Sequence, residues 1–149
     1  MFAIIYDITR KALNALGLRN GASHSEYKIT EDGRIVIMEV GGRMGGDFIG
    51  SELVHLSTGY DFVKGVINVA LGEFEEPVKT KNMCSGVYFL CAETQYLKTI
   101  VEKWNDNPLF IVGEITDSEL HRVTCSADRS GYVIYRADNK LVLTNAPSY

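Results

Sequence analysis

Two glutamates flank a predicted turn near the start of the chain, and their spacing would bring two carboxylates together. Asp32-Gly33 lies between runs of residues that favour β-strands, and Asp-Gly is a strong signal for a two-residue hairpin turn. In that register Glu26 lies directly opposite Glu39. Opposed carboxylates repel each other, and a cation between them would convert the repulsion into binding. Magnesium suits such a site, because proteins usually bind it through one or two carboxylates plus substrate phosphates.

Two other interpretations of this stretch stay open. In the first, the glutamates occupy a solvent-exposed hairpin face that has no binding role. In the second, the loop has three residues, Glu31-Asp32-Gly33, and a bulge shifts the pairing by one, which would place Glu39 opposite a neighbour of Glu26.

A glycine-rich loop with one arginine follows the second glutamate. The segment Val40–Asp47 reads VGGRMGGD. Glycine lets backbone N–H groups approach an anion closely, and arginine offers a planar fork that suits phosphate or carboxylate. A flexible connection with a solvated arginine is the plainer interpretation. The position of Arg43, four residues after a candidate metal ligand, favours an anion-binding loop.

In combination, these motifs resemble the C-terminal half of an ATP-grasp ligase. The resemblance rests on small residues, His-x-Glu-aromatic at 24–27, the hairpin, Glu-x-x-x-Arg at 39–43 and the glycines. It continues through LVHLSTGYDFVKGVINVALGE at 53–73, covers Leu16–Glu73 well and is weaker from Met83 onward. The pattern is most similar to carboxylate–amine ligases, including amino-acid ligases, and more distantly to biotin carboxylase and carbamoyl-phosphate synthase.

The resemblance implies a role for each residue of the motif. Glu26 and Glu39 match the acidic ligands of Mg²⁺ or Mn²⁺ that bridge to the ATP phosphates. Arg43 matches the catalytic arginine that steadies the phosphoryl group or the acyl phosphate, and Gly45 and Gly46 fall in the part that binds the cofactor. The implied reaction is phosphorylation of a small carboxylate substrate by ATP, followed by attack of an amine.

The sequence also departs from the family pattern. Gly41 stands where many members have an asparagine that helps to bind metal. The adenine-binding hinge and the lysines that hold the α- and β-phosphates are not found, so we expect a fragment that is inactive alone. Its expected partner is the missing N-terminal half or a second copy in a homodimer. The alternative function is a non-catalytic binding, regulatory or oligomerisation module derived from the ATP-grasp fold.

Composition sets further expectations. The net charge of −4 argues against nucleic-acid binding, which favours a basic surface. Cys84, Cys91 and Cys125 fit no metal or redox spacing, and we expect them to behave as small buried hydrophobic residues in a reducing compartment. The apolar run at the start is too short to cross a membrane. We therefore expect a cytoplasmic location without membrane attachment.

Periodicity predicts an α+β protein. Helical spacing indicates helices over Ile4–Leu16, Ile49–Leu56 and Tyr60–Leu71, the last with Phe62, Val66, Val69 and Ala70 buried. A charged turn that ends at Pro77 separates residues 1–76, the C-terminal part of an ATP-grasp domain, from residues 77–149, a small β-rich subdomain. Short β-like runs follow at Gly86–Ala92, Thr99–Trp104, Leu109–Ile115, Leu120–Cys125, Tyr132–Arg136 and Leu141–Thr144.

Overall fold

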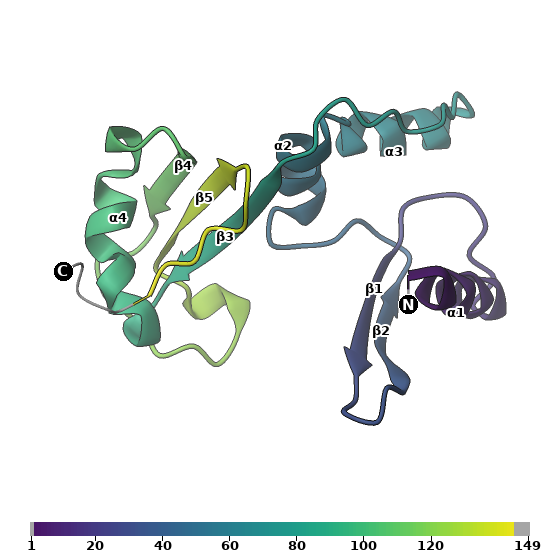
Figure 1. Cartoon of the computed structure of the whole chain (residues 1–149), viewed down its shortest axis with the longest axis horizontal. Coiled ribbons are helices and arrows are strands. Elements are labelled where there is room, and N and C mark those ends of the chain that lie inside the picture. Colours follow the sequence, from purple (N-terminus) through teal and green to yellow (C-terminus); the bar gives the residue numbers. More distant parts are fainter. Residues whose placement is uncertain (1, 145–149) are drawn as a thin grey trace. The chain divides into compact units, whose positions relative to one another are not determined.

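The protein is α+β, with two small antiparallel sheets and four α-helices among the described residues. We describe residues 2–144 from a computed structural model (Figure 1). These residues form two compact units: unit 1 comprises residues 2–51 and 61–77, and unit 2 comprises residues 52–60 and 78–144. These two units are defined by packing within the chain. They do not test the division into family-based domains at residue 76, which stays a prediction.

The first sheet, in unit 1, is the predicted hairpin. Strand β1 spans His24–Ile29 and strand β2 spans Ile35–Gly41. The connection is the three-residue alternative, because Thr30 N–H donates to the Arg34 carbonyl and Gly33 adopts a left-handed φ of 80°. Ile29 accordingly pairs with Ile35, and Tyr27 with Ile37.

A bulge changes the register of the two strands towards the end of the hairpin that lies away from the turn. The shift lies between Glu26 and Tyr27 on β1, and it leaves Met38 of β2 as the extra residue. Beyond it Glu26 pairs with Glu39. The predicted pairing of the two glutamates is therefore confirmed, although the turn itself follows the alternative register.

Helix α1 covers one face of the hairpin. It spans Phe2–Ala15, as the spacing predicted, and packs against β2. The Thr9 hydroxyl lies 2.6 Å from the Tyr27 hydroxyl, which fixes the helix to β1 as well. Figure 1 shows α1 beside the hairpin. The opposite face of the hairpin carries Glu26, since successive side chains of a strand alternate between faces.

Helix α3, also in unit 1, spans Phe62–Leu71. The Asp61 carboxylate accepts a hydrogen bond from Lys64 N–H at 2.9 Å and caps the helix, and Gly72 ends it in the left-handed region. The predicted buried stripe is wrong at Ala70, which is exposed, while Phe62, Val66 and Val69 are only half-buried. No other element of unit 1 encloses this helix closely enough to bury a large side chain.

Unit 1 leaves much of its apolar surface uncovered. None of its large hydrophobic side chains is buried within residues 2–51 and 61–77. Of the seventeen large hydrophobic residues exposed in the described chain, thirteen belong to this unit. Phe2 at 79% exposure, Tyr6 at 74% and Leu71 at 66% are among the most exposed. The large apolar side chains of unit 1 therefore lie mostly at its surface.

Unit 2 has a conventional core around a three-stranded sheet. Strand β5 (Gly131–Ala137) lies between β3 (Cys84–Leu90) and β4 (Phe110–Ile115). A 3₁₀ helix (Ala92–Leu97) continues into α4 (Lys98–Glu102) and covers one face, as Figure 1 shows. The core residues Leu90, Leu97, Val101, Phe110, Val133 and Tyr135 meet there.

The remaining elements are short. A π-helical turn (Ile49–Leu53) leads into α2 (Val54–Thr58), and single 3₁₀ turns occur at Trp104–Asp106 and Ser126–Asp128. No helix within residues 2–144 is long and apolar enough to span a bilayer.

Three predicted strands are wrong. The segment Thr99–Trp104 is mostly helical, because Leu97, Val101 and Trp104 at helical spacing pack against the sheet. Leu120–Cys125 belongs to a long loop. Leu141–Thr144 forms no strand either; the Tyr88 hydroxyl instead donates to the Leu141 carbonyl at 2.7 Å and holds this segment against the core.

Leu97 should dominate the stability of unit 2. Its side chain is fully buried, so Leu97→Ala should lower the free energy of unfolding by about 2–5 kcal/mol through lost burial and a residual cavity. Leu109→Ala is the matched control, because that side chain is 38% exposed, and it should cost much less. Urea unfolding followed by Trp104 fluorescence measures both. Equal losses for the two variants would contradict this description of the core.

Candidate functional site

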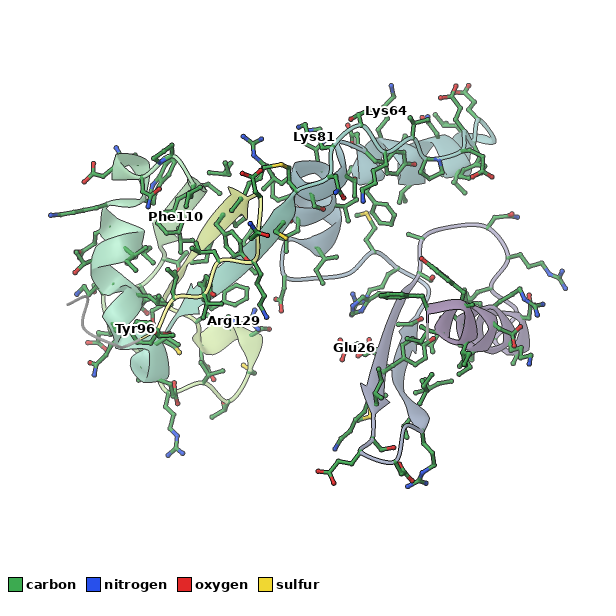
Figure 2. All side chains as sticks on the ribbon, in the orientation of Figure 1. Glu26, Lys64, Lys81, Tyr96, Phe110 and Arg129 are labelled. Atoms are coloured by element: carbon green, nitrogen blue, oxygen red, sulfur yellow. The ribbon has the colours of Figure 1, made fainter. Side chains whose placement is uncertain are left out.

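The candidate site lies on the hairpin face that α1 does not cover. Glu26 and Glu39 are directly opposed across the two strands, with side chains 56% and 50% exposed. Figure 2 shows Glu26 on the side of the hairpin away from α1. The two carboxylates are therefore open to solvent and to a ligand, and the strand backbone fixes where their side chains begin.

The bulge at Met38 is what brings the two glutamates together. If the pairing found next to the turn continued along the strands without a bulge, Glu26 would lie opposite Met38 and Glu39 opposite Ser25. One extra residue in β2 moves Glu39 into line with Glu26. Bulges commonly re-aim a side chain next to a functional site.

Arg43 lies beside Glu39. Its Nη2 donates to Glu39 Oε1 at 3.4 Å, and its Nη1 donates to the Met44 carbonyl at 2.7 Å. The side chain is 57% exposed, so the ion pair is screened by water and contributes little to stability. The structure thus places Arg43 next to one of the paired carboxylates, where it reduces the repulsion between them.

The glycines of the loop differ in what they permit. A side chain at Gly45 would come within 3.1 Å of Ile49 and 3.2 Å of the His24 ring, whereas one at Gly46 would meet nothing within 4 Å. Gly45 is therefore needed for close packing, while a Cβ at Gly46 would lie in open space. The next two residues, Asp47 and Phe48, have positive φ values of 51° and 63°. Such conformations concentrate at functional sites.

Gly41 has room for a side chain. A Cβ there would make only ordinary contacts, at 3.5 Å from Arg43 Cγ and 3.7 Å from Glu39 Oε1. Packing therefore does not exclude the asparagine that the family resemblance places at this position.

His24 borders the same site. Its Nδ1 lies 3.9 Å from Glu26 Oε1, and its side chain is only 20% exposed. This histidine belongs to the motif that carries the family resemblance, and the structure places it beside Glu26. Its burial could not be foreseen, because it depends on how the loop containing Gly45 folds back.

The donor set can be compared with the needs of a metal. Within residues 2–144, no three His, Cys, Asp or Glu side chains are grouped closely enough to bind a metal ion by themselves. Two carboxylates are nevertheless sufficient for Mg²⁺ when substrate phosphates and water supply the other oxygens. Glu26 and Glu39 fit a metal that arrives with a nucleotide, and they do not fit a permanently bound structural metal.

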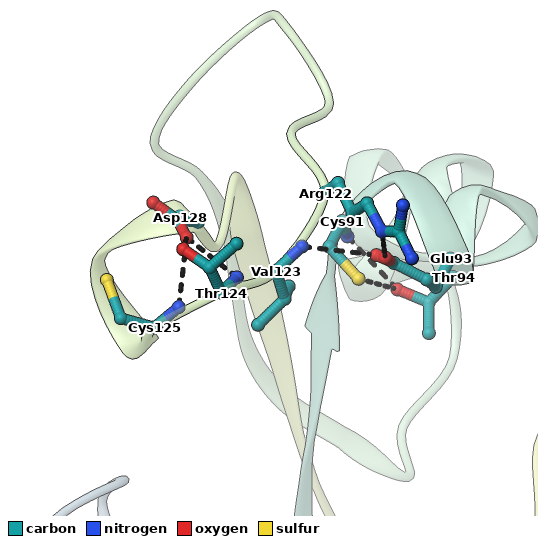
Figure 3. A network of polar contacts seen from close by, with 8 residues as sticks. All are labelled: Cys91, Glu93, Thr94, Arg122, Val123, Thr124, Cys125 and Asp128. Atoms are coloured by element: carbon teal, nitrogen blue, oxygen red, sulfur yellow. Dashed lines mark hydrogen bonds and ion pairs between the residues drawn. The ribbon is translucent and has the colours of Figure 1, made fainter.

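A second polar cluster, in unit 2, has a structural explanation. Figure 3 shows the Asp128 carboxylate accepting hydrogen bonds from Thr124 and from Cys125 N–H. The Thr124 hydroxyl bond is the main cause that lowers the pKa of Asp128 to about 2. Glu93 accepts from Val123 N–H at 3.4 Å and pairs with Arg122. These carboxylates satisfy the backbone of a long loop, of which one part, Leu120–Cys125, was predicted to be a strand.

The cysteines are only partly as expected. All three are free, and Cys91 is buried with its Sγ 3.1 Å from the Thr94 hydroxyl. Cys125 is exposed and Cys84 is half-buried, so the expectation of three buried thiols is wrong for these two residues.

Comparison with known proteins yields structural similarity without sequence similarity. No protein-family model matches the chain, and no curated protein is significantly similar to it. An L-amino acid ligase from Bacillus licheniformis superimposes with a TM-score of 0.70 and 21% identity, over 93% of this chain and 36% of the ligase. A phosphoribosylglycinamide synthetase from Anaerococcus prevotii gives 0.59 and 18%, over 87% of this chain and 35% of the synthetase.

This chain therefore spans about a third of the length of the two solved enzymes. The similarity at such low identity concerns the fold. The described chain has the fold of part of an ATP-grasp ligase.

Proposed function

We propose that this chain supplies the magnesium- and phosphate-binding part of an ATP-dependent carboxylate–amine ligase that works through an acyl phosphate. The observation that carries the proposal is the direct opposition of Glu26 and Glu39 on an open hairpin face. Arg43 adjoins them, and the surrounding fold is that of part of an ATP-grasp ligase. ATP and Mg²⁺ or Mn²⁺ are the proposed cofactors.

The proposed chemistry has two steps. A carboxylate oxygen of the substrate attacks the γ-phosphorus of ATP, and ADP leaves. The amine nitrogen then attacks the acyl carbon of the acyl phosphate, loses a proton and expels phosphate. Bound metal shields the negative charge of the phosphates, as in other phosphoryl transfers.

The residues of this chain would position the charged groups. Glu26 and Glu39 would hold the metal with its phosphates over the hairpin face. Arg43 would turn from Glu39 towards the transferring phosphoryl group, since its ion pair is weak and its side chain is exposed. The backbone N–H of Gly46, which no neighbouring side chain crowds at the Cβ position, would donate to the same group.

The proposed partner is the remainder of an ATP-grasp ligase. Unit 1 buries no large hydrophobic side chain of its own, and its apolar surface requires a cover. Roughly two thirds of each solved ligase has no counterpart in this chain. A segment with that missing part of the fold would provide the cover together with the nucleotide-binding groups. A homodimer is the other partner consistent with the uncovered surface.

The second candidate function is a non-catalytic binding, regulatory or oligomerisation module. Gly41 favours it, since the position lacks the asparagine oxygen although the structure leaves room for it. In that case the hairpin would keep its shape and bind neither metal nor phosphate.

The hairpin carboxylates should bind Mn²⁺ with ATP. Paramagnetic broadening of the amide signals of β1 and β2, with Mn²⁺ added in the presence of ATP, measures this site directly. Glu26→Gln and Glu39→Gln should each weaken binding by at least about 10-fold, the lower end of the cost of losing even an outer-shell partner of a metal. Both substitutions are isosteric and should leave the hairpin folded.

Glu31→Gln is the matched control. Glu31 is an exposed carboxylate in the turn of the same hairpin, and its replacement removes the same charge. Binding should survive in this variant. An absence of broadening in the unaltered chain, or equal losses in all three variants, would reject the metal-binding role of this chain and favour the non-catalytic module.

Arg43→Gln should change metal and nucleotide binding in opposite directions. Arg43 neutralises Glu39, so its loss should strengthen binding of Mn²⁺ alone by about 1.5- to 5-fold, the value of an exposed ion pair. Binding of Mn²⁺ with ATP should weaken by roughly 10-fold, because a charge-assisted bond to phosphate is lost. Arg34→Gln in the turn should change neither. A uniform shift in both titrations would show that Arg43 does not contact phosphate.

Gly41→Asn should strengthen the metal site. The new side chain has space beside Glu39 and adds a third oxygen ligand, so Mn²⁺ affinity should rise by about 5-fold, equivalent to roughly 1 kcal/mol for one added polar contact. Gly46→Asn adds the same side chain in open space and serves as the control. An unchanged affinity for Gly41→Asn would mean that the metal does not lie on this side of Glu39.

A further inference from the structure

His24 carries a buried polar atom without a partner. The Nδ1 atom is inaccessible to solvent, and among the described residues it neither donates nor accepts a hydrogen bond. A buried polar atom in this state is costly, and such atoms in native structures call for an explanation such as a functional role. His24 is therefore a candidate donor to a neighbouring side chain that can move to meet it.

The carboxylate of Glu26 lies close to this atom. His24 and Glu26 are two positions apart on β1, so their side chains share one face of the strand. Nδ1 lies 3.9 Å from Glu26 Oε1, which is longer than a hydrogen bond. A movement of about 1 Å by the carboxylate would close the gap to the usual donor–acceptor distance.

The histidine ring is the fixed member of this pair. Only 20% of its side chain is exposed, whereas that of Glu26 is 56% exposed and can rotate. The loop holds the ring in place, because Gly45 approaches its Cδ2 edge so closely that an added Cβ would lie 3.2 Å away. Opposite His24 in the register is Gly41, which has no side chain to compete for the space.

We propose that His24 is a positioning residue whose Nδ1–H donates to Glu26 and orients that carboxylate towards Glu39 and a shared divalent cation. The inference rests on the proposed function, since it concerns the same metal site. One oxygen of Glu26 would accept from the ring, and the other would face the cation. Outer-shell donors of this kind orient ligating carboxylates and strengthen metal binding.

If His24 donates to Glu26, its ring must adopt one particular tautomer in the metal-free protein. The ring must be protonated at Nδ1 to donate to Glu26, and Nε2 then bears no proton in the neutral form. Nitrogen-15 NMR of the full chain, labelled at histidine, identifies the tautomer of His24 at a pH where the ring is neutral. The Nδ1–H form supports the inference. The Nε2–H form would overturn it, whether or not the chain binds metal.

Substitutions at His24 test the donor position. The amide nitrogen of asparagine is two bonds beyond Cβ, as Nδ1 is, whereas that of glutamine is one bond farther. His24→Asn should therefore keep Mn²⁺–ATP affinity within about 3-fold, while His24→Gln and His24→Leu should weaken it by about 10-fold or more, as loss of an outer-shell partner does. The hairpin amide signals report in each variant whether the strands remain paired.

The outcomes separate this inference from the proposed function. A merely structural role would make His24→Asn as harmful as His24→Leu, because both remove the packed ring, and that result would overturn the positioning role. Failure of the unaltered chain to bind Mn²⁺ would reject the proposed function instead. In that case the tautomer still decides whether His24 donates to Glu26.

Discussion

The bulge that places two carboxylates opposite each other is the feature on which the candidate site of unit 1 depends. A hairpin whose only requirement was stability would not place Glu26 opposite Glu39, since like charges at paired positions are unfavourable. The bulge at Met38 creates this pairing, so one local irregularity of the backbone brings two negatively charged side chains into opposition. The positive charge of Arg43, beside Glu39, offsets part of the repulsion between the two carboxylates. A cation bound between the two carboxylates would reduce the repulsion between them.

The two units meet different physical demands. Unit 2 encloses Leu97, Val101 and Val133 almost completely, and its polar loop is satisfied by internal carboxylates such as Asp128. Unit 1 has a two-stranded sheet and one covering helix, and isolated hairpins of this size are at best marginally stable in water. The unit that carries the candidate site is therefore the one whose packing is incomplete within the described chain.

Local signals in the sequence predicted the elements of unit 1 and the three strands of the unit 2 sheet, together with three strands in unit 2 that do not form. The hairpin was predictable because Asp32-Gly33 and the flanking residues act over short distances. The pairing of Glu26 with Glu39 was predicted from a two-residue turn, whereas the structure reaches it through a three-residue turn and a bulge. Thr99–Trp104 was misassigned because its β-branched residues outweighed the helical spacing that begins at Leu97. The burial of His24 depends on loop packing, which no local pattern encodes.

If the proposed function holds, the incomplete packing of unit 1 would affect its affinity for metal. A metal bound between Glu26 and Glu39 gains from a rigid hairpin, since residues that support a site must hold its ligands in place. Where the hairpin fluctuates, part of the binding free energy is spent on ordering the strands. A partner that covers the exposed apolar surface of unit 1 would order the same strands in advance, so metal and partner would each strengthen the binding of the other. Under the proposed function, covering the apolar surface of unit 1 and binding metal at the carboxylate pair would therefore be coupled.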